Sequence, residues 1–251
     1  MPLKNISIIL AGTLNSGNIG SVARAMKTMG LSRLKLVNPQ CEIDEQAVWM
    51  ATHGEDVLQN AECVSSIRDA VADATYVFGT TARSRKWRDR LTPEDMAQKV
   101  LSLGDHNRVA LMFGPENSGL NNNDLELCND VVTIPTDDNA TSLNVSHAVM
   151  IVCYEIFKTL SQKDAPAKRE KIPELAPSNK LEEMYDHMRF ALLEIGYLDP
   201  YNTEHAIGNF RRVLTKALLT TYDVQLIRGV FRQLVWYIKH TKKTMENDTK
   251  G

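Results

Sequence analysis

The chain has 251 residues, of which 43% are hydrophobic, so it can bury one substantial core and a smaller second unit. It has no apolar run of about 18 residues, which a membrane-spanning helix needs, and its first residues lack a signal-peptide pattern. Its four cysteines are scattered and include no C-x-x-C pair, which is typical of reduced thiols and not of a disulfide framework or zinc site. We therefore expect a cytoplasmic protein without a membrane span or a metal.

Short apolar runs alternate with helical patterns over residues 6–160. Residues 6–11, 34–39, 75–81, 109–114 and 131–135 have the β-branched and aromatic composition of buried parallel strands. Helical patterns are expected at 19–29, 44–60, 63–73, 93–103, 121–128 and 142–160. This alternation predicts an α/β fold, an open and mostly parallel sheet with helices on both faces. The last helix, 142–160, is apolar almost all round, so we expect it to be buried on more than one side.

The composition changes after residue 160. Residues 161–178 contain three prolines and many charges, which is typical of a linker. Beyond it, 179–195 and 205–240 carry apolar residues three and four positions apart, as helices do. The sequence therefore predicts a domain at 1–160, a linker at 161–178 and a small α-helical domain at 179–251.

The net charge of −2 is unevenly distributed. Residues 1–160 contain 14 Lys and Arg against 19 Asp and Glu, whereas residues 161–251 contain 15 against 12. A stretch at 205–245 has eight basic residues and only Asp223 as an acid. Such a stretch favours a polyanionic partner, although a solvated helical face fits it equally well. The eight are Arg211, Arg212, Lys216, Arg228, Arg232, Lys239, Lys242 and Lys243.

Four loops follow predicted strand ends, where open α/β sheets bind their ligands: 14–30, 80–90, 113–120 and 135–144. Common nucleotide motifs are absent from them. Asn18 stands where a Walker A loop needs its lysine, and no strand is followed by G-x-G-x-x-G. The histidines lack metal-ligand spacing, and the nucleophile elbow G-x-S-x-G is missing. These absences argue against an ATPase, a dehydrogenase, a zinc enzyme and a serine hydrolase.

Three of the loops carry ordered motifs. They are N-x-G-x-x-x-R (Asn18, Gly20, Arg24), F-G-x-E-x-x-G-L (113–120) and I-P followed by S-L-N (Ile134, Pro135, 142–144). Together they resemble the motifs of SPOUT RNA methyltransferases. The resemblance is closest to the TrmJ type, which 2′-O-methylates nucleotide 32 of tRNA, and it is supported further by segments 17–30, 36–39 and 79–85. It implies a C-terminal trefoil knot in the sheet domain, S-adenosylmethionine as cofactor, tRNA as substrate and a homodimer.

The same resemblance implies the site residues. Arg24, Asn18 and Ser142 would be catalytic, and Arg24, Arg83 and Arg85 would contact RNA. Ser142 stands where its hydroxyl could cap the following helix, and Glu116 could hold its loop through backbone N–H groups. The implied cofactor residues are Thr80, Thr81, Ala82, Gly114, Ile134, Thr141, Ser142 and Leu143.

Arg24 is the residue to which the family's mechanism assigns the essential role. An arginine is effectively never deprotonated, so it is a poor candidate for a general base. We expect its guanidinium to hold the 3′-phosphate and to stabilise the developing alkoxide, while water accepts the proton. Asn18 is expected to position Arg24.

One departure from the TrmJ type is Ala140, where an aromatic residue is expected, and it leaves the preferred nucleotide open. Two other functions also stay open. One is an rRNA 2′-O-methyltransferase of the same superfamily, although those enzymes usually carry an N-terminal RNA-binding domain. The other is a non-catalytic RNA-binding module that kept the fold, against which the intact Arg24, Asn18 and Ser142 argue.

Overall fold

A computed structural model describes residues 3–82, 90–139, 142–161 and 172–248, with side chains as far as His240 in the last helix. The chain divides into two compact units, residues 1–173 and 174–251. Within the described residues no helix is long and apolar enough to cross a membrane.

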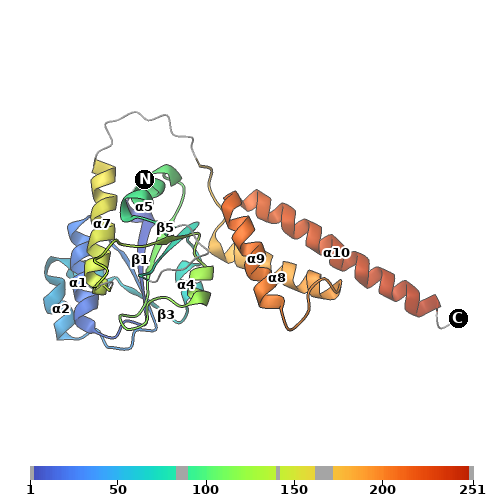
Figure 1. The fold of residues 1–251 in the computed structure, drawn as a ribbon, viewed down its shortest axis with the longest axis horizontal. Helices are drawn as coiled ribbons and strands as arrows, with labels where there is room; N and C mark the ends of the chain where they lie inside the picture. Colours follow the sequence, from blue (N-terminus) through green and yellow to red (C-terminus); the bar gives the residue numbers. More distant parts are fainter. Residues whose placement is uncertain (1–2, 83–89, 140–141, 162–171, 249–251) are drawn as a thin grey trace. The chain divides into compact units, whose positions relative to one another are not determined.

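The first unit is built on a seven-stranded sheet in which every pair of neighbours is parallel (Figure 1). The strand order is β3-β2-β1-β6-β4-β7-β5. The strands are β1 (Ile6–Ala11), β2 (Arg33–Val37), β3 (Glu62–Val64), β4 (Tyr76–Thr80), β5 (Arg90–Leu91), β6 (Val109–Phe113) and β7 (Asp130–Val132). This confirms the predicted open parallel sheet.

Helices cover both faces of the sheet, also as predicted. On one face α7 packs against both α1 and α5, and α2 packs on α1. On the other face α4 and α6 contribute to a core with β1, β4 and β6. The helices are α1 (Ser16–Thr28), α2 (Glu45–Ala51), α3 (Glu55–Gln59), α4 (Ile67–Val71), α5 (Pro93–Leu103), α6 (Asn122–Glu126) and α7 (Val145–Ser161).

The order of the strands explains where the loops meet. β1, β6, β4 and β7 are four consecutive neighbours in the sheet. Because all are parallel, their carboxyl ends share one edge. The loops that follow them carry the three sequence motifs, although the first motif is about a hundred residues from the other two in the chain. A crevice at this edge is the usual ligand site of an open α/β sheet.

Two predicted helical segments of the first unit are interrupted or shared with a strand. The segment 44–60 is divided into α2, a 3-10 turn at Thr52–Gly54 and α3, with Thr52 at a φ of 46°. In the segment 63–73, residues up to Val64 belong to the edge strand β3, and α4 begins after the cap residue Ser66. The edge strands β3 and β5 were not predicted, because they have only three and two residues and lack an apolar run.

The second unit is helical, as predicted. It contains α8 (Ser178–Glu194), α9 (Thr203–Leu214), a 3-10 turn (Thr215–Ala217) and α10 (Thr221–Asp248). Predicted helix 205–240 is therefore wrong as one element, since Leu218 has a left-handed conformation and separates α9 from α10. Leu175 and Ala176, within the stretch expected to be a linker, are buried, and Ala176 belongs to the core of this unit.

Candidate active site

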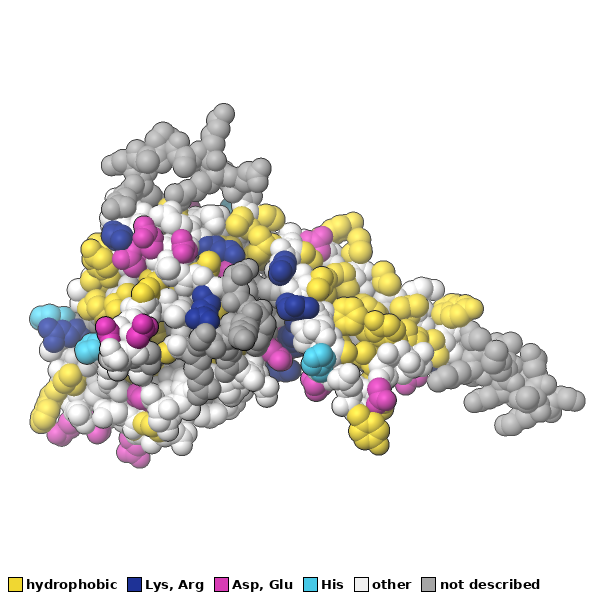
Figure 2. All heavy atoms as spheres, viewed as in Figure 1, with side chains coloured by type: hydrophobic (Ala, Val, Ile, Leu, Met, Phe, Trp, Pro, Cys, Tyr) yellow, Lys and Arg dark blue, Asp and Glu magenta, His cyan; other side chains and the backbone are white. Residues whose placement is uncertain are grey.

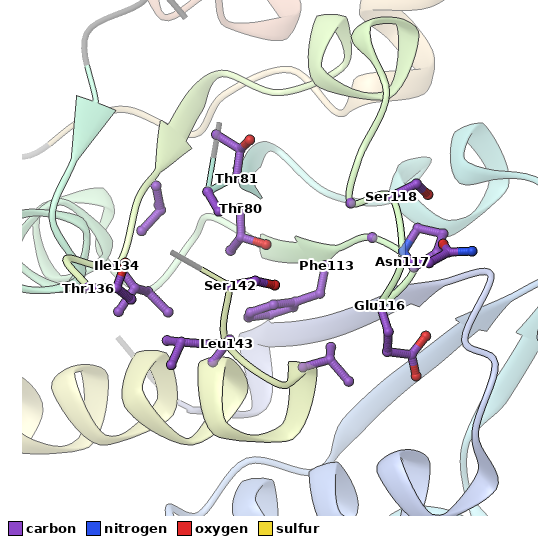
Figure 3. A pocket seen from close by; sticks show the side chains of 17 residues that line it. Thr80, Thr81, Phe113, Glu116, Asn117, Ser118, Ile134, Thr136, Ser142 and Leu143 are labelled. Atoms are coloured by element: carbon purple, nitrogen blue, oxygen red, sulfur yellow. The ribbon is translucent and has the colours of Figure 1, made fainter. Parts of the chain in front are cut away.

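A cavity of about 280 Å³ lies at the carboxyl edge of the sheet (Figure 3). Its walls come from the segments that follow β4, β6 and β7 and from the start of α7. Seven of the predicted cofactor residues line it: Thr80, Thr81, Ala82, Gly114, Ile134, Ser142 and Leu143. The eighth, Thr141, lies outside the described residues, as do Arg83 and Arg85.

Glycines let the 114–120 loop fold back tightly beside this cavity. A Cβ atom on Gly114 would lie 2.3 Å from the backbone of Gly119 and Leu120. Gly119 has a φ of 63°, and its N–H donates to the carbonyl of Pro115 at 2.8 Å. A side chain at Gly114 would therefore open the turn that forms this wall.

The lining combines an apolar wall with polar groups. Phe113, Ile134 and Leu143 provide apolar surface, while Glu116, Asn117, Ser118 and Thr136 provide polar atoms. Sequence reasoning did not assign Phe113, Asn117, Ser118 or Thr136 to the cavity. The first three lie inside the 113–120 motif and Thr136 lies in the 135–144 loop, so each belongs to a segment expected to bind a ligand, although the residue itself was not singled out. The chemistry suits a ligand that combines a planar apolar ring with hydroxyl or charged groups.

Glu116 joins this cavity to the first loop. Its Oε2 accepts at 3.1 Å from the backbone N–H of Leu14, which belongs to the first loop and not to the loop of Glu116 itself, and its Oε1 accepts from Asn18 Nδ2 at 2.7 Å. In Figure 3 the carboxylate points away from Thr80 and Thr81, toward the blue N-terminal part of the chain. Asn18 Oδ1 in turn accepts from Asn144 Nδ2 at 2.9 Å. The three motifs are thus linked by hydrogen bonds.

Ser142 does not cap the following helix, so that prediction was wrong. Helix α7 begins at Val145, and the residue before it, Asn144, accepts from the N–H and hydroxyl of Ser146 at 2.8 and 2.6 Å. The helix thus starts later than the apolar pattern indicated, with Leu143 and Asn144 between Ser142 and its first residue. Ser142 is exposed and faces the cavity, beside Phe113 (Figure 3).

Arg24 lies on α1 and is exposed. Within the described part of the chain its side chain forms no hydrogen bond or ion pair, and the hydrogen bonds of the Asn18 side chain there are to Glu116 and Asn144. Any positioning of Arg24 by Asn18 therefore acts through the helix that carries both residues.

Other reactive groups do not gather here. Burial raises the pKa of the Cys41 thiol, and the charges of Glu116 and Asp44 raise it further, which disfavours the thiolate form that a nucleophile needs. Within the residues that the structure describes, no group of three or more His, Cys, Asp or Glu is arranged to hold a metal ion.

The chain matches two family descriptions. Residues 5–154 match the SpoU rRNA methylase family, and residues 179–248 match the C-terminal domain of the tRNA methyltransferase TrmJ. A similar curated protein, the tRNA (cytidine/uridine-2′-O-)-methyltransferase TrmJ of Klebsiella pneumoniae, is 36% identical over 92% of this chain and 97% of its own. The corresponding protein of Cronobacter sakazakii is 37% identical over 92% and 96%. The crystal structure of TrmJ from Z. mobilis is similar with a TM-score of 0.79, 33% identity and coverage of 91% and 98%.

Proposed function

This chain belongs to the SpoU rRNA methylase family, and we propose that it methylates a ribose 2′-hydroxyl of tRNA, at nucleotide 32 of the anticodon loop, using S-adenosylmethionine. The observation that carries the proposal is the match to TrmJ relatives over both units, at 36% identity and 92% of the chain. A match restricted to the sheet domain would not indicate which class of RNA is the substrate. The second unit, however, also matches the C-terminal domain of a tRNA enzyme. The resemblance inferred from the three motifs is thereby confirmed.

S-adenosylmethionine is the cofactor of this family and supplies an electrophilic methyl group on a sulfonium sulfur. The cavity fits it chemically: the apolar wall of Phe113, Ile134 and Leu143 suits the adenine ring, and the polar atoms around Ser118 and Thr136 suit hydroxyl and amino-acid groups. We assign the contacts to the lining residues named above and to Thr141. Backbone groups provide much of the recognition, since several of the side chains are apolar.

Methyl transfer forms a C–O bond at the ribose, breaks the C–S bond with its electron pair left on sulfur, and releases the hydroxyl proton. The protein's part is to orient the ribose and to stabilise negative charge on its oxygen. Arg24 is suited to both tasks, because its guanidinium is exposed and has no partner within the described residues. We propose that Arg24 binds the adjacent phosphate and stabilises the developing alkoxide, and that water accepts the proton.

The second unit offers basic side chains to RNA, although fewer than the sequence suggested. Arg211 is buried and pairs with both carboxylate oxygens of Glu182, so it is unavailable to a phosphate. Arg228 pairs with Glu183 at 2.8 Å. The exposed basic residues that remain in the described part of this stretch include Arg212, Lys216 and Lys239. With Arg83 and Arg85 from the first unit, they form the RNA contacts we propose.

A homodimer, a cytoplasmic location and a trefoil knot complete the proposal. The apolar face of α7 supports the dimer, because Tyr154 and Phe157 remain 48% and 42% exposed although the helix packs on α1 and α5. Apolar side chains are also exposed on the helical unit (Figure 2), among them Tyr222, Leu226 and Val230 of α10. The family resemblance supports the cytoplasmic location and the knot.

The test is mass spectrometry of nucleosides from tRNA and rRNA of a strain that lacks the gene. One 2′-O-methylated nucleoside should disappear from tRNA, and it should return when the wild-type chain is supplied but not when Arg24→Ala is supplied. Loss from rRNA alone would favour the rRNA enzyme. No loss from either RNA, together with no methyl transfer by the purified protein, would favour the non-catalytic binding module.

A further inference from the structure

Glu116, Asn18 and Asn144 form a chain of hydrogen bonds whose direction is fixed at both ends. At one end is the Glu116 carboxylate, which can only accept. At the other end is the backbone N–H of Ser146, which can only donate. Between them, each amide uses its Nδ2 toward Glu116 and its Oδ1 toward α7, so that neither amide can be turned over without placing like groups together.

These hydrogen bonds connect segments whose relative positions the reaction must keep fixed. Glu116 lines the cofactor cavity, Asn144 follows the cavity residues Ser142 and Leu143, and Asn18 lies in the first turn of α1. Arg24 is carried by the same helix, six residues later. Glu116 also holds the entry to α1 through the N–H of Leu14. Sequence separations of 98 and 126 residues are bridged by single hydrogen bonds.

We infer that Glu116 is a positioning residue, which orients the Asn18 and Asn144 amides and thereby sets the cofactor cavity in register with the helix that carries Arg24. This inference rests on the proposed function, because it assigns Arg24 and the cavity to one reaction. Its physical basis is the charge of Glu116. A neutral amide at position 116 would offer a donor where one of its two present partners, Leu14 N–H or Asn18 Nδ2, already donates.

Because these hydrogen bonds all run in one direction, the carboxylate of position 116 and the amide of position 18 can be exchanged. In Asn18→Asp, two carboxylates face each other and one hydrogen bond is lost. In Glu116→Gln, two donors face each other. In the double variant Asn18→Asp/Glu116→Gln, the amide oxygen at position 116 accepts from Leu14, and the amide nitrogen there donates to the carboxylate at position 18. The other oxygen of that carboxylate accepts from Asn144, so every bond of the chain is made again with the charge moved to position 18.

The experiment measures kcat for tRNA methylation at saturating cofactor, together with the Kd for S-adenosylmethionine and the Tm of each protein. Each single variant should lower kcat by about 10- to 100-fold, as expected for a lost hydrogen bond to a charged group. The double variant should recover to within about threefold of wild type. Asn18→Asp brings two carboxylates together, and this repulsion outweighs the favourable helix-dipole interaction of an aspartate in the first turn of α1, so its Tm should fall and should recover in the double variant.

Asn144→Asp gives a second test that does not depend on the exchange. An aspartate keeps the acceptor for Ser146 and so preserves the helix cap, but it loses the donor to Asn18. Its kcat should fall while its Tm stays unchanged. The matched control is Asn121→Asp, because Asn121 also caps a helix, accepting from Asp124 N–H at 3.0 Å, and its Nδ2 has no partner within the described residues. The control should keep wild-type kcat.

Single variants with wild-type kcat, or a double variant no better than the worse single variant, would overturn the inference. A wild-type protein that transfers no methyl group to tRNA would instead overturn the proposed function.

Discussion

Arg24 is the residue on which the proposed chemistry depends most. We expect Arg24→Ala to lower the rate of methyl transfer by about 100- to 1000-fold, since one charge-assisted interaction with the transition state is removed. The Kd for S-adenosylmethionine should be nearly unchanged, because Arg24 does not line the cavity. Lys27→Ala is the matched control, as Lys27 is on the same helix and pairs with the exposed Asp56. A variant that keeps more than half of the activity would show that another residue has this role.

Asp73 gives a prediction about pH. Burial raises the pKa of this carboxyl, but hydrogen bonds and charges from Lys35 and Arg33 outweigh it and lower the pKa from 3.8 to about 2. Because the folded pKa lies below the unfolded one, the stabilisation is complete above about pH 4 and is lost as the pH falls through about 2. The Asp73 carboxylate also neutralises the charge of Lys35, whose side chain is only 6% exposed.

Asp73→Asn should therefore lower the free energy of unfolding at pH 7. The difference from wild type should shrink as the pH falls from about 4 toward 2, where the wild-type carboxyl is also becoming neutral. Denaturant unfolding at a series of pH values measures both effects. A difference that stays constant down to about pH 2 would contradict the assignment of the stabilisation to the Asp73 charge.

The backbone of helix α1 is in close contact with the backbones of α2 and of the turn at Thr52–Gly54. A Cβ atom on Gly20 would lie 2.0 Å from the carbonyl oxygen of Ala47 in α2, and one on Gly54 would lie 2.7 Å from the backbone of Ala23. The break in the predicted helix 44–60 follows from these contacts, since the chain bends at Thr52 and Gly54 meets α1 just after the bend.

Gly20→Ala should destabilise the first unit by about 1–3 kcal/mol, because α2 must move away. Gly229→Ala is the matched control in α10, where a Cβ atom would meet nothing within 4 Å. There the same substitution should stabilise the helix by about 0.5–1 kcal/mol. Denaturant unfolding of both variants checks the opposite signs, and equal effects would mean that α1 and α2 can separate at little cost.

At the scale of the whole molecule, we expect the first unit to bind the cofactor by itself and the second unit to contribute much of the affinity for tRNA. A chain that ends after Pro173 should still bind S-adenosylmethionine but bind tRNA less tightly, because the first 160 residues carry 14 basic against 19 acidic side chains. Its salt dependence should also be shallower, by about 0.7–0.9 in slope for each phosphate that is no longer neutralised. Filter binding across a salt series compares it with the full chain. Equal affinities and slopes would show that the second unit does not hold the RNA.

The proposed homodimer is also a property of the whole molecule. Light scattering of the wild-type protein should give twice the 28.2 kDa of one chain. The double variant Tyr154→Lys/Phe157→Lys should shift the mass toward the monomer, since it places charges on the exposed apolar face of α7. Thr28→Lys on α1 is a charge control at an exposed, polar position. An active wild-type monomer would refute the dimer.

The sequence by itself determined the architecture, because that depends on patterns within short segments. Five apolar runs with helices between them were sufficient to predict a parallel sheet, and α5 was predicted with both of its ends, at Pro93 and Leu103. The three ordered motifs were sufficient to associate Asn18, Glu116 and Ser142 with one site. The sequence also contains the Thr220-x-x-Asp223 capping pair, a local signal that starts α10 and divides the predicted helix 205–240.

Only the tertiary structure decided which partner each polar group has. Asn18 was expected to position Arg24, yet it bonds to Glu116 and Asn144, which lie 98 and 126 residues away. Arg211 was counted among the basic residues available to RNA, yet it is buried against Glu182. Hydrogen bonds and ion pairs of this kind form only where distant segments place donor and acceptor at the right separation to within a few tenths of an ångström. Periodicity and motif spacing specify which segments meet, but not which atoms.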